Sequence, residues 1–134
     1  MAIPLELTID GSPVSQQTRR RTLVRQWTQE VRDVVGRAWG SDPPVADEVM
    51  VTITYFYENT SMDVDNIPKP ILDALKGLVI LDDSQITDLL CRKRVLSPSF
   101  QTRNLSPVLH RALGQAGQFV HIVVDDAPDQ EVIF

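Results

Sequence analysis

Four aspartates near the middle of the chain are the residues with the clearest chemical potential. Asp63 and Asp65 stand two positions apart, and Asp82 and Asp83 follow after a hydrophobic stretch. Hard divalent cations such as Mg²⁺ take oxygen ligands and need only one or two carboxylates besides water and phosphate oxygens. Asp63, Asp65 and Asp83 are therefore candidate magnesium ligands, although aspartate is also a common turn and capping residue.

A strand and a helix are predicted on either side of the first two aspartates. β-branched and aromatic residues alternate over 49–57, as they do in a strand. Downstream, apolar residues recur at helical spacing over 71–78, and Asp65 or Asn66 is the expected N-cap. Asp63 and Asp65 are thus expected where a strand turns into a helix.

The predicted helix carries a polar stripe. Lys69, Asp73 and Lys76 fall at helical spacing opposite the apolar residues. Pro68 and Pro70 cost little if they lie in the first helical turn. Because Pro70 disfavours helical backbone in the residue before it, a start only after Lys69 is the alternative, and Gly77 is the expected stop. Lys69 is placed to stabilise negative charge near the aspartates, and it also suits a surface ion pair with Asp73.

The order and spacing of these residues closely resemble the RusA family of Holliday junction resolvases. The resemblance covers chiefly residues 49–95, with weaker support from 11–15. It implies a small homodimeric endonuclease that depends on Mg²⁺, with Mn²⁺ as a substitute, and that introduces paired nicks in four-way DNA junctions. The matching residues are Asp63, Asp65, Asn66, Lys69, Asp73, Leu75, Asp82, Asp83, Gln85 and Ile86.

The resemblance also implies a role for individual residues. It makes Asp63, Asp65 and Asp83 the metal ligands and Lys69 the essential lysine. Phosphodiester hydrolysis requires a polarised phosphate, an activated water and a cation near the charge that develops in the transition state. The supporting residues are Asn66, Asp73, Lys76 and Asp82.

Length and composition predict a single domain over 1–134. Hydrophobic residues make up 43% of the chain and charged residues 23%, as in ordinary globular proteins. We find no leader and no apolar run long enough to cross a membrane, so we expect a cytoplasmic protein, bacterial or phage-encoded. Cys91 is the only cysteine, which excludes an internal disulfide. His110 and His121 receive no role.

The charge balance opposes a nucleic-acid partner at first sight. The net charge is −5, whereas DNA-binding proteins neutralise phosphates with lysine and arginine. Local charge matters more than the sum, and two basic clusters are candidate DNA contacts. Alternation over 88–96 predicts that the second cluster divides between the two sides of a strand. The residues concerned are Arg19, Arg20, Arg21, Arg92, Lys93 and Arg94.

The predicted fold is α+β, a mixed sheet covered by helices in the order strand, helix, strand, helix, strand, strand. Further strands are expected over 5–9, 88–96 and 118–124, and an amphipathic helix over 22–40. Its core-facing residues are expected to be Val24, Trp27, Val31, Val34 and Ala38.

An insert at about 97–117 interrupts the compact pattern before the last strand. A short helix is predicted inside it, with Ser106 before its first residue and Gly114 at its end. A dimer arm, a DNA-contacting flap and a partner-binding insert are the alternatives for its role.

Three other functions remain alternatives at the level of sequence. The first is a metal-dependent nuclease acting on flaps, replication forks or RNA. The second is a DNA- or protein-binding module that keeps the fold without cleaving, although the acids and Lys69 are all present. The third is a small-molecule phosphate enzyme, which ought to show a glycine-rich phosphate loop that this sequence lacks.

Overall fold

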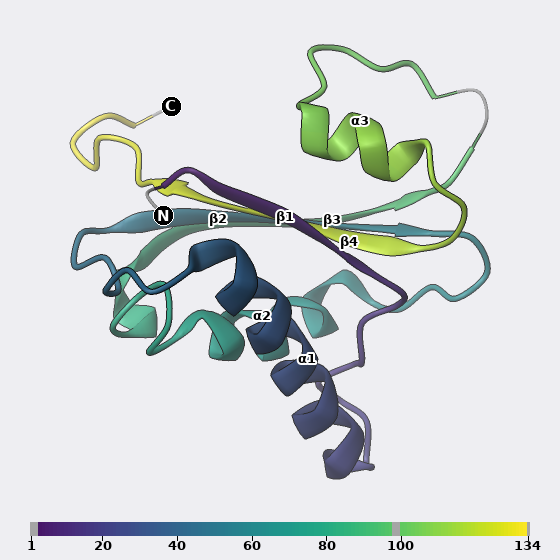
Figure 1. Ribbon diagram of the computed structural model, residues 1–134, viewed down its shortest axis with the longest axis horizontal. Coiled ribbons are helices and arrows are strands. Elements are labelled where there is room, and N and C mark those ends of the chain that lie inside the picture. The colour runs from purple at the N-terminus through teal and green to yellow at the C-terminus, as the bar shows by residue number, and fades with distance from the viewer. Residues whose placement is uncertain (1–2, 98–99, 134) are drawn as a thin grey trace.

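The computed structural model describes residues 3–97 and 100–133. Within these ranges, the segments with alternating patterns form one sheet and the segments with helical patterns form three helices (Figure 1). The α+β class is confirmed. Within those described ranges, no helix is long and apolar enough to cross a membrane. The elements are β1 (Leu5–Asp10), α1 (Arg21–Trp39), β2 (Val49–Tyr57), the 3-10 turn η1 (Val64–Asn66), α2 (Pro68–Leu75), the 3-10 turn η2 (Asp83–Gln85), β3 (Ile86–Val95), α3 (Pro107–Leu113) and β4 (Phe119–Asp126).

The sheet has the strand order β1-β4-β2-β3. Strand β4 runs antiparallel to both β1 and β2, whereas β2 and β3 are parallel, with Tyr57 opposite Val95. A parallel pair cannot be joined by a tight hairpin and requires a crossover connection, which α2 supplies here. Asp63, Asp65 and Asp83 all lie in this crossover between β2 and β3.

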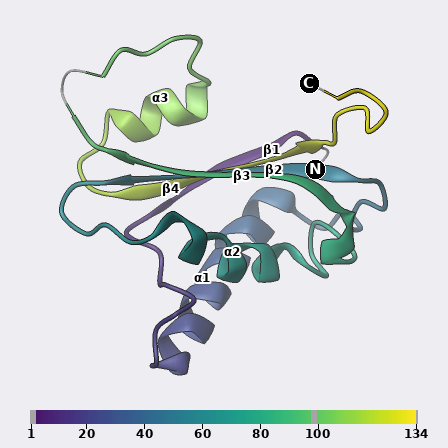
Figure 2. The ribbon, with the colours of Figure 1, turned by 180° about the vertical axis from the view of Figure 1, so that it is seen from behind.

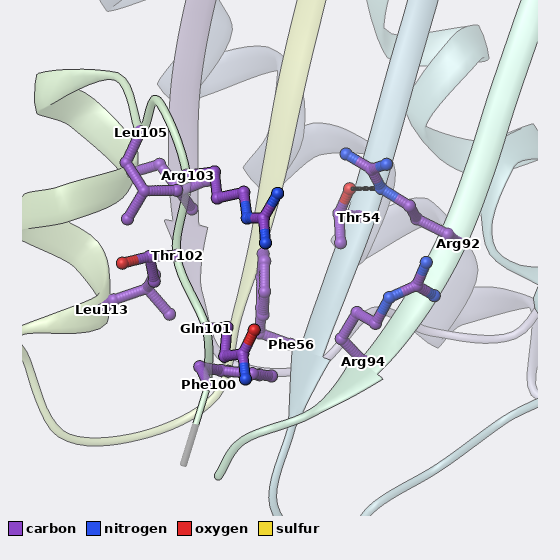
Figure 3. A pocket seen from close by; sticks show the side chains of 11 residues that line it. Thr54, Phe56, Arg92, Arg94, Phe100, Gln101, Thr102, Arg103, Leu105 and Leu113 are labelled. Carbon is purple, nitrogen blue, oxygen red and sulfur yellow. Dashed lines mark hydrogen bonds between the residues drawn. The ribbon is translucent and has the colours of Figure 1, made fainter. Parts of the chain in front are cut away.

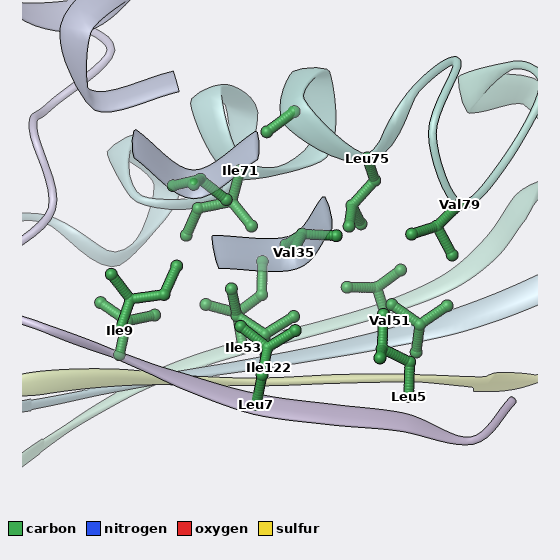
Figure 4. Close-up of a cluster of buried hydrophobic side chains, with 14 of the residues drawn as sticks. Leu5, Leu7, Ile9, Val35, Val51, Ile53, Ile71, Leu75, Val79 and Ile122 are labelled. Atoms are coloured by element: carbon green, nitrogen blue, oxygen red, sulfur yellow. The ribbon is translucent and has the colours of Figure 1, made fainter. Parts of the chain in front are cut away.

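The main core lies between the sheet and the helices α1 and α2, which cover the same face (Figures 1 and 4). The predicted burial of Val24, Trp27 and Val31 on α1 is confirmed, but the next two fully covered residues are Val35 and Trp39. The expected Val34 and Ala38 are only partly buried. After Val31 the buried residues of α1 are spaced four apart, where the prediction used a step of three to Val34. Both spacings are close to the 3.6 residues of one helical turn.

Helix α2 departs from the predicted boundaries at both ends. It begins at Pro68, with both prolines in its first turn, so the alternative start after Lys69 is wrong. It ends at Leu75, so the helical spacing predicted over 71–78 runs three residues too far. The backbone is already helical at Ile67, the N-cap, because η1 leads directly into α2. Prolines in a first helical turn lack only donors that would have no partner inside the helix.

The expected N-caps of α2 are also wrong, since Asp65 and Asn66 belong to η1. At the other end Gly77 turns the chain away with a φ of 80°, which favours glycine. Arg32 of α1 donates from Nη1 to the carbonyl oxygens of Ala74 and Lys76, at 3.3 and 2.8 Å. This arginine satisfies carbonyls that a helix end leaves without partners and ties α1 to α2.

The opposite face of the sheet is covered by α3 (Figure 2). The short helix predicted in the insert is confirmed, with Ser106 as N-cap and Gly114 as C-cap. A second cluster forms where Ala112 of α3 packs with Phe56 of β2 and Phe119 of β4. Strand β2 is therefore buried on both faces near its end, and the insert folds back over the sheet. Residues 98 and 99 of the insert lie outside the described residues.

A polar contact fastens α3 to the sheet. Ser106 accepts a hydrogen bond from the Leu109 amide at 3.2 Å and donates its own to the Glu6 carboxylate of β1. The same carboxylate oxygen lies 2.6 Å from Nε2 of His121 on β4, a side chain that is 6% exposed. His121, which received no role from the sequence, thus belongs to a structural network.

We expect Ser106→Ala to lower the free energy of unfolding by about 1 kcal/mol, because the N-cap acceptor and the donor to Glu6 are both lost. Urea unfolding followed by circular dichroism measures this change. Ser41→Ala, an exposed serine in a loop, is the control and is expected to leave stability unchanged. Equal stability of the Ser106 variant and the wild type would contradict the proposed fastening of α3.

Candidate functional site

The loop that leads from β2 to Asp63 is held in place by polar contacts from the sheet. The Gln118 carbonyl Oε1 accepts from the amides of Glu58, Asn59 and Thr60, at 2.9, 3.2 and 3.2 Å. The Tyr55 hydroxyl donates to the Thr60 carbonyl oxygen at 2.6 Å. Loops without such contacts are more mobile than the elements they join, so these bonds fix the approach to the aspartates.

Lys93 of β3 completes the support of this loop. Its ammonium donates to Ser61 Oγ at 3.1 Å and to the Met62 carbonyl oxygen at 2.8 Å, next to Asp63. The predicted alternation of β3 is confirmed, because Arg92 and Arg94 lie on the α3 face with Leu109. The structure thus divides the second predicted basic cluster, and Lys93 fixes the acidic loop.

Asp63 and Asp65 lie immediately before α2. Asp63 precedes η1 and Asp65 lies within it, and both side chains are exposed. Neither carboxylate accepts a hydrogen bond or forms an ion pair among the residues that the structure describes. Two exposed carboxylates with free oxygens suit a hard cation that retains its waters.

Asp82 and Asp83 lie on the other side of α2, around η2. The Asp82 carboxylate accepts from the Ser84 amide at 3.2 Å and pairs with the Lys76 ammonium at 3.2 Å. Asp83 is exposed and makes no hydrogen bond or close ion pair in the described part of the chain, although its charge acts on Lys76. Of these two acids, Asp83 keeps its oxygens free for a ligand, whereas Asp82 serves as a cap.

The two pairs of acids are separated by the length of α2. Eight residues of α-helix span about 12 Å. No group of three or more His, Cys, Asp or Glu side chains within 3–97 and 100–133 is placed to hold a metal ion. The donor chemistry of Asp63 and Asp65 fits Mg²⁺, which needs only one or two carboxylates. Binding by the full set with Asp83 stays a prediction, which metal titration tests.

The polar side of α2 faces the N-terminal part of α1 across a groove of about 430 Å³. Lys69 and Asp73 form an ion pair of 2.6 Å, with both side chains about half exposed. Arg21, from the first predicted basic cluster, lies in the groove wall, and Arg19 and Arg20 are exposed just before α1. The lining residues are Gln16, Arg21, Val24, Arg25, Thr28, Gln29 and Asp73.

Segment 11–18 joins this groove to the aspartates, because the Gln16 amide donates to the Asn66 carbonyl oxygen at 3.1 Å. The structure therefore brings the first basic cluster and Lys69 to the same side of the molecule as Asp65. The model of the endodeoxyribonuclease RusA family matches residues 11–99, more than half of the chain. The chain belongs to the RusA family.

The predicted resemblance is confirmed, and the match spans Asp63, Asp65, Lys69 and Asp83. It ends before α3, so the RusA family match does not include the helix of the insert. No curated protein matches the chain. Family membership makes this protein a relative of DNA endonucleases, and the exposed carboxylates beside Lys69 are consistent with such chemistry.

Sequence reasoning gave no role to several residues that position the acids in this RusA family protein. Gln85 was part of the matching pattern, and the structure shows why its amide is needed. Its Oε1 accepts from the amides of Leu81 and Asp82, while its Nε2 donates to the carbonyl oxygens of Val45 and Asp47. For Gln118 no local signal exists, because it contacts residues about 60 positions away.

The Asp82 carboxylate stabilises the folded state of this RusA family protein, and this stabilisation is lost at acidic pH. Hydrogen bonds from Ser84, followed by the Lys76 ammonium, lower the pKa of Asp82 from 3.8 to about 2. A carboxyl whose pKa is depressed by folding stabilises the native state above its unfolded pKa, and the contribution is lost as pH falls through the folded pKa.

We therefore expect the urea midpoint of the wild type to fall between about pH 4 and about pH 2, and to fall less steeply in Asp82→Asn. Urea titrations across this range measure the two slopes. Asp47→Asn removes an exposed carboxylate elsewhere and is expected to retain the wild-type slope. Identical slopes for wild type and Asp82→Asn would contradict the assigned role of Asp82.

Proposed function

We propose that this protein is a magnesium-dependent endonuclease that resolves four-way DNA junctions by paired nicks, acting as a homodimer. The observation that carries the proposal is the family match over 11–99, which spans every predicted metal ligand. The exposed positions of Asp63 and Asp65 beside α2 support it.

Asp63 and Asp65 would hold the ion. Asp83 is proposed as a further ligand from its place in the family pattern, and because it lies at the far end of α2, its binding requires a closer approach to Asp65 than this structure has. When bound, Mg²⁺ polarises a phosphoryl oxygen and makes a bound water more acidic. The residues of the chain supply orientation, since Gln118, Tyr55 and Lys93 fix the loop that carries Asp63.

Lys69 is the candidate for stabilising charge on the phosphate. Its ammonium is 2.6 Å from Asp73, but both groups are about half exposed. An exposed ion pair of this kind is worth roughly 0–1 kcal/mol. Lys69 can therefore exchange Asp73 for a phosphate oxygen at small cost, and a cation near developing negative charge lowers the barrier.

DNA contacts are proposed for Arg19, Arg20 and Arg21, which lie beside the polar groove at the start of α1. Phosphate contacts supply sequence-independent affinity and make it fall with salt. The net charge of −5 is compatible with this role because the arginines concentrate positive charge locally.

A homodimer is proposed because two symmetric nicks require two related sites. Strand β3 lies at the edge of the sheet and exposes Leu89, Leu90 and Val95. An exposed edge with apolar side chains favours association with another chain. Light scattering during size-exclusion chromatography tests the expected dimer, and a monomer at assay concentration would contradict it.

The decisive assay compares a synthetic four-way junction with a linear duplex of the same sequence, in Mg²⁺, Mn²⁺ or EDTA. We expect paired nicks in the junction only, with either metal and not in EDTA. Flaps, forks and RNA as additional substrates test the broader nuclease alternative. Junction binding without cleavage in any metal would favour a non-catalytic module and contradict the proposal.

A further inference from the structure

A pocket of about 340 Å³ lies between the sheet and the insert (Figure 3). It is on the face of the sheet that α3 covers, away from α1 and α2 (Figures 1 and 2). It opens between strands β2 and β3 on one side and segment 100–113, which includes α3, on the other. Its size is at the lower end of the range for small-ligand sites, about 300–1,000 Å³. The segment that forms one wall lies beyond the family match, so the pocket is not explained by family membership.

Three arginines line this pocket, and no lining residue is acidic. Arg92 donates from Nε to Thr54 Oγ1 at 2.9 Å, which fixes the guanidinium on the sheet. Figure 3 shows Arg103 extending from the opposite wall toward the side of the pocket that carries Arg92 and Arg94. No arginine of the three pairs with a carboxylate in the part of the chain that the structure describes.

Like charges that share a pocket repel one another, and the repulsion is relieved when an anion binds between them. Arginine is suited to phosphate because its planar guanidinium can donate two parallel hydrogen bonds. Arg94 uses Nη1 for the Lys93 carbonyl oxygen at 2.9 Å, which leaves its second terminal nitrogen for a ligand. The charge in the pocket therefore selects a phosphate-bearing ligand.

The remaining walls are aromatic and aliphatic. Phe100 is 36% exposed and meets Phe56 edge to face, with ring centroids 6.2 Å apart. Phe56 is in turn stacked on Phe119 with centroids 4.8 Å apart, so the aromatic group is anchored in the second core cluster. An exposed ring on a fixed support offers a stacking surface for a planar group, and base stacking on aromatic side chains is worth about 1–3 kcal/mol.

We propose that this pocket binds a nucleoside phosphate, with the base against Phe100 and the phosphate among Arg92, Arg94 and Arg103. Two sources share this chemistry, a free nucleotide and an unpaired nucleotide in a DNA strand. A volume of about 340 Å³ suits one nucleotide better than an extended acidic peptide. The site does not depend on cleavage, because it lies across the sheet from α2, which the aspartates flank (Figure 2).

Binding measurements in EDTA test this site without any contribution from cleavage. The probes are thymidine 5′-monophosphate, followed by calorimetry, and a fluorescein-labelled single strand of ten thymidines, followed by anisotropy. We expect Arg103→Ala and Phe100→Ala each to raise the dissociation constant of the probe that binds at least about tenfold, because each variant loses one charged or stacking contact. Binding of the monophosphate alone identifies a free nucleotide, and binding of the strand alone identifies DNA.

Arg111→Ala is the matched control, because Arg111 lies on α3 but not in the pocket wall. For the single-stranded DNA probe, we also expect Arg103→Ala to reduce the magnitude of the slope of log affinity against log salt concentration by about 0.7. Circular dichroism checks that each variant folds. The proposal is overturned if neither probe binds, if Arg103→Ala and Phe100→Ala bind like the wild type, or if Arg111→Ala loses as much affinity.

Discussion

Asp65→Asn is expected to reduce junction cleavage by about a hundredfold to a thousandfold, the size of effect seen when one group that stabilises transition-state charge is removed. The substitution keeps the shape of the side chain and removes its negative charge, so a bound cation loses a ligand. Initial cleavage rates of the junction in Mg²⁺, at enzyme excess, measure the change.

Stability and DNA affinity are expected to survive the same substitution. Asp65 is exposed and makes no hydrogen bond or ion pair within the described residues, so its carboxylate supports no contact of the fold. Exposed substitutions of this kind change stability by about 0.5 kcal/mol or less. Removal of a negative charge near DNA leaves junction affinity in EDTA equal or slightly higher.

Asp47→Asn makes the same chemical change at an exposed carboxylate near β2 and is expected to cleave at the wild-type rate. A cleavage rate for Asp65→Asn within a few-fold of the wild type would refute the assignment of Asp65 to the site. Asp83→Asn, measured in parallel, tests whether the acid at the far end of α2 acts with Asp65.

The elements that could be predicted are those with strong local signals. Strand β2 was predicted with its observed bounds, because β-branched and aromatic residues fill 49–57 apart from Met50. Helix α3 was predicted because Ser106 and Gly114 mark its two ends. Local signals leave the start of helix α2 open, because the rule about the residue before proline opposes the tolerance of a first turn for proline. In the structure the first turn is helical and Ile71 is packed in the core.

The candidate site could be predicted as residue types but not as an arrangement. The acids and Lys69 were visible from spacing, yet only the structure shows that α2 separates Asp65 from Asp83. The groups that position them act across long sequence separations, as Lys93 does toward Met62 and Gln118 toward Glu58. The pocket near Arg103 arises from contact between β3 and the insert, which no local pattern encodes.

Gln85→Glu is expected to lower the free energy of unfolding by about 3 kcal/mol, because two donated hydrogen bonds are lost in a partly buried place. The amide Nε2 donates to the carbonyl oxygens of Val45 and Asp47 at 2.8 and 2.9 Å. A carboxylate oxygen in its place would face both carbonyls without a proton. Urea unfolding at pH 7 measures the loss, and Gln115→Glu adds the same charge at an exposed residue as control.

The pH dependence of the stability of Gln85→Glu distinguishes the loss of these two hydrogen bonds from a simple change of side-chain shape. The two carbonyl oxygens favour the protonated, donating form of the introduced carboxyl, whereas its other oxygen accepts from the Leu81 and Asp82 amides in either form. We therefore expect its pKa to lie above the unfolded value. The free energy of unfolding of Gln85→Glu, relative to that of the wild type, is therefore expected to be highest at low pH and to fall as pH rises through that pKa. A deficit that does not vary with pH would show that the carbonyls of Val45 and Asp47 are not what demands an amide.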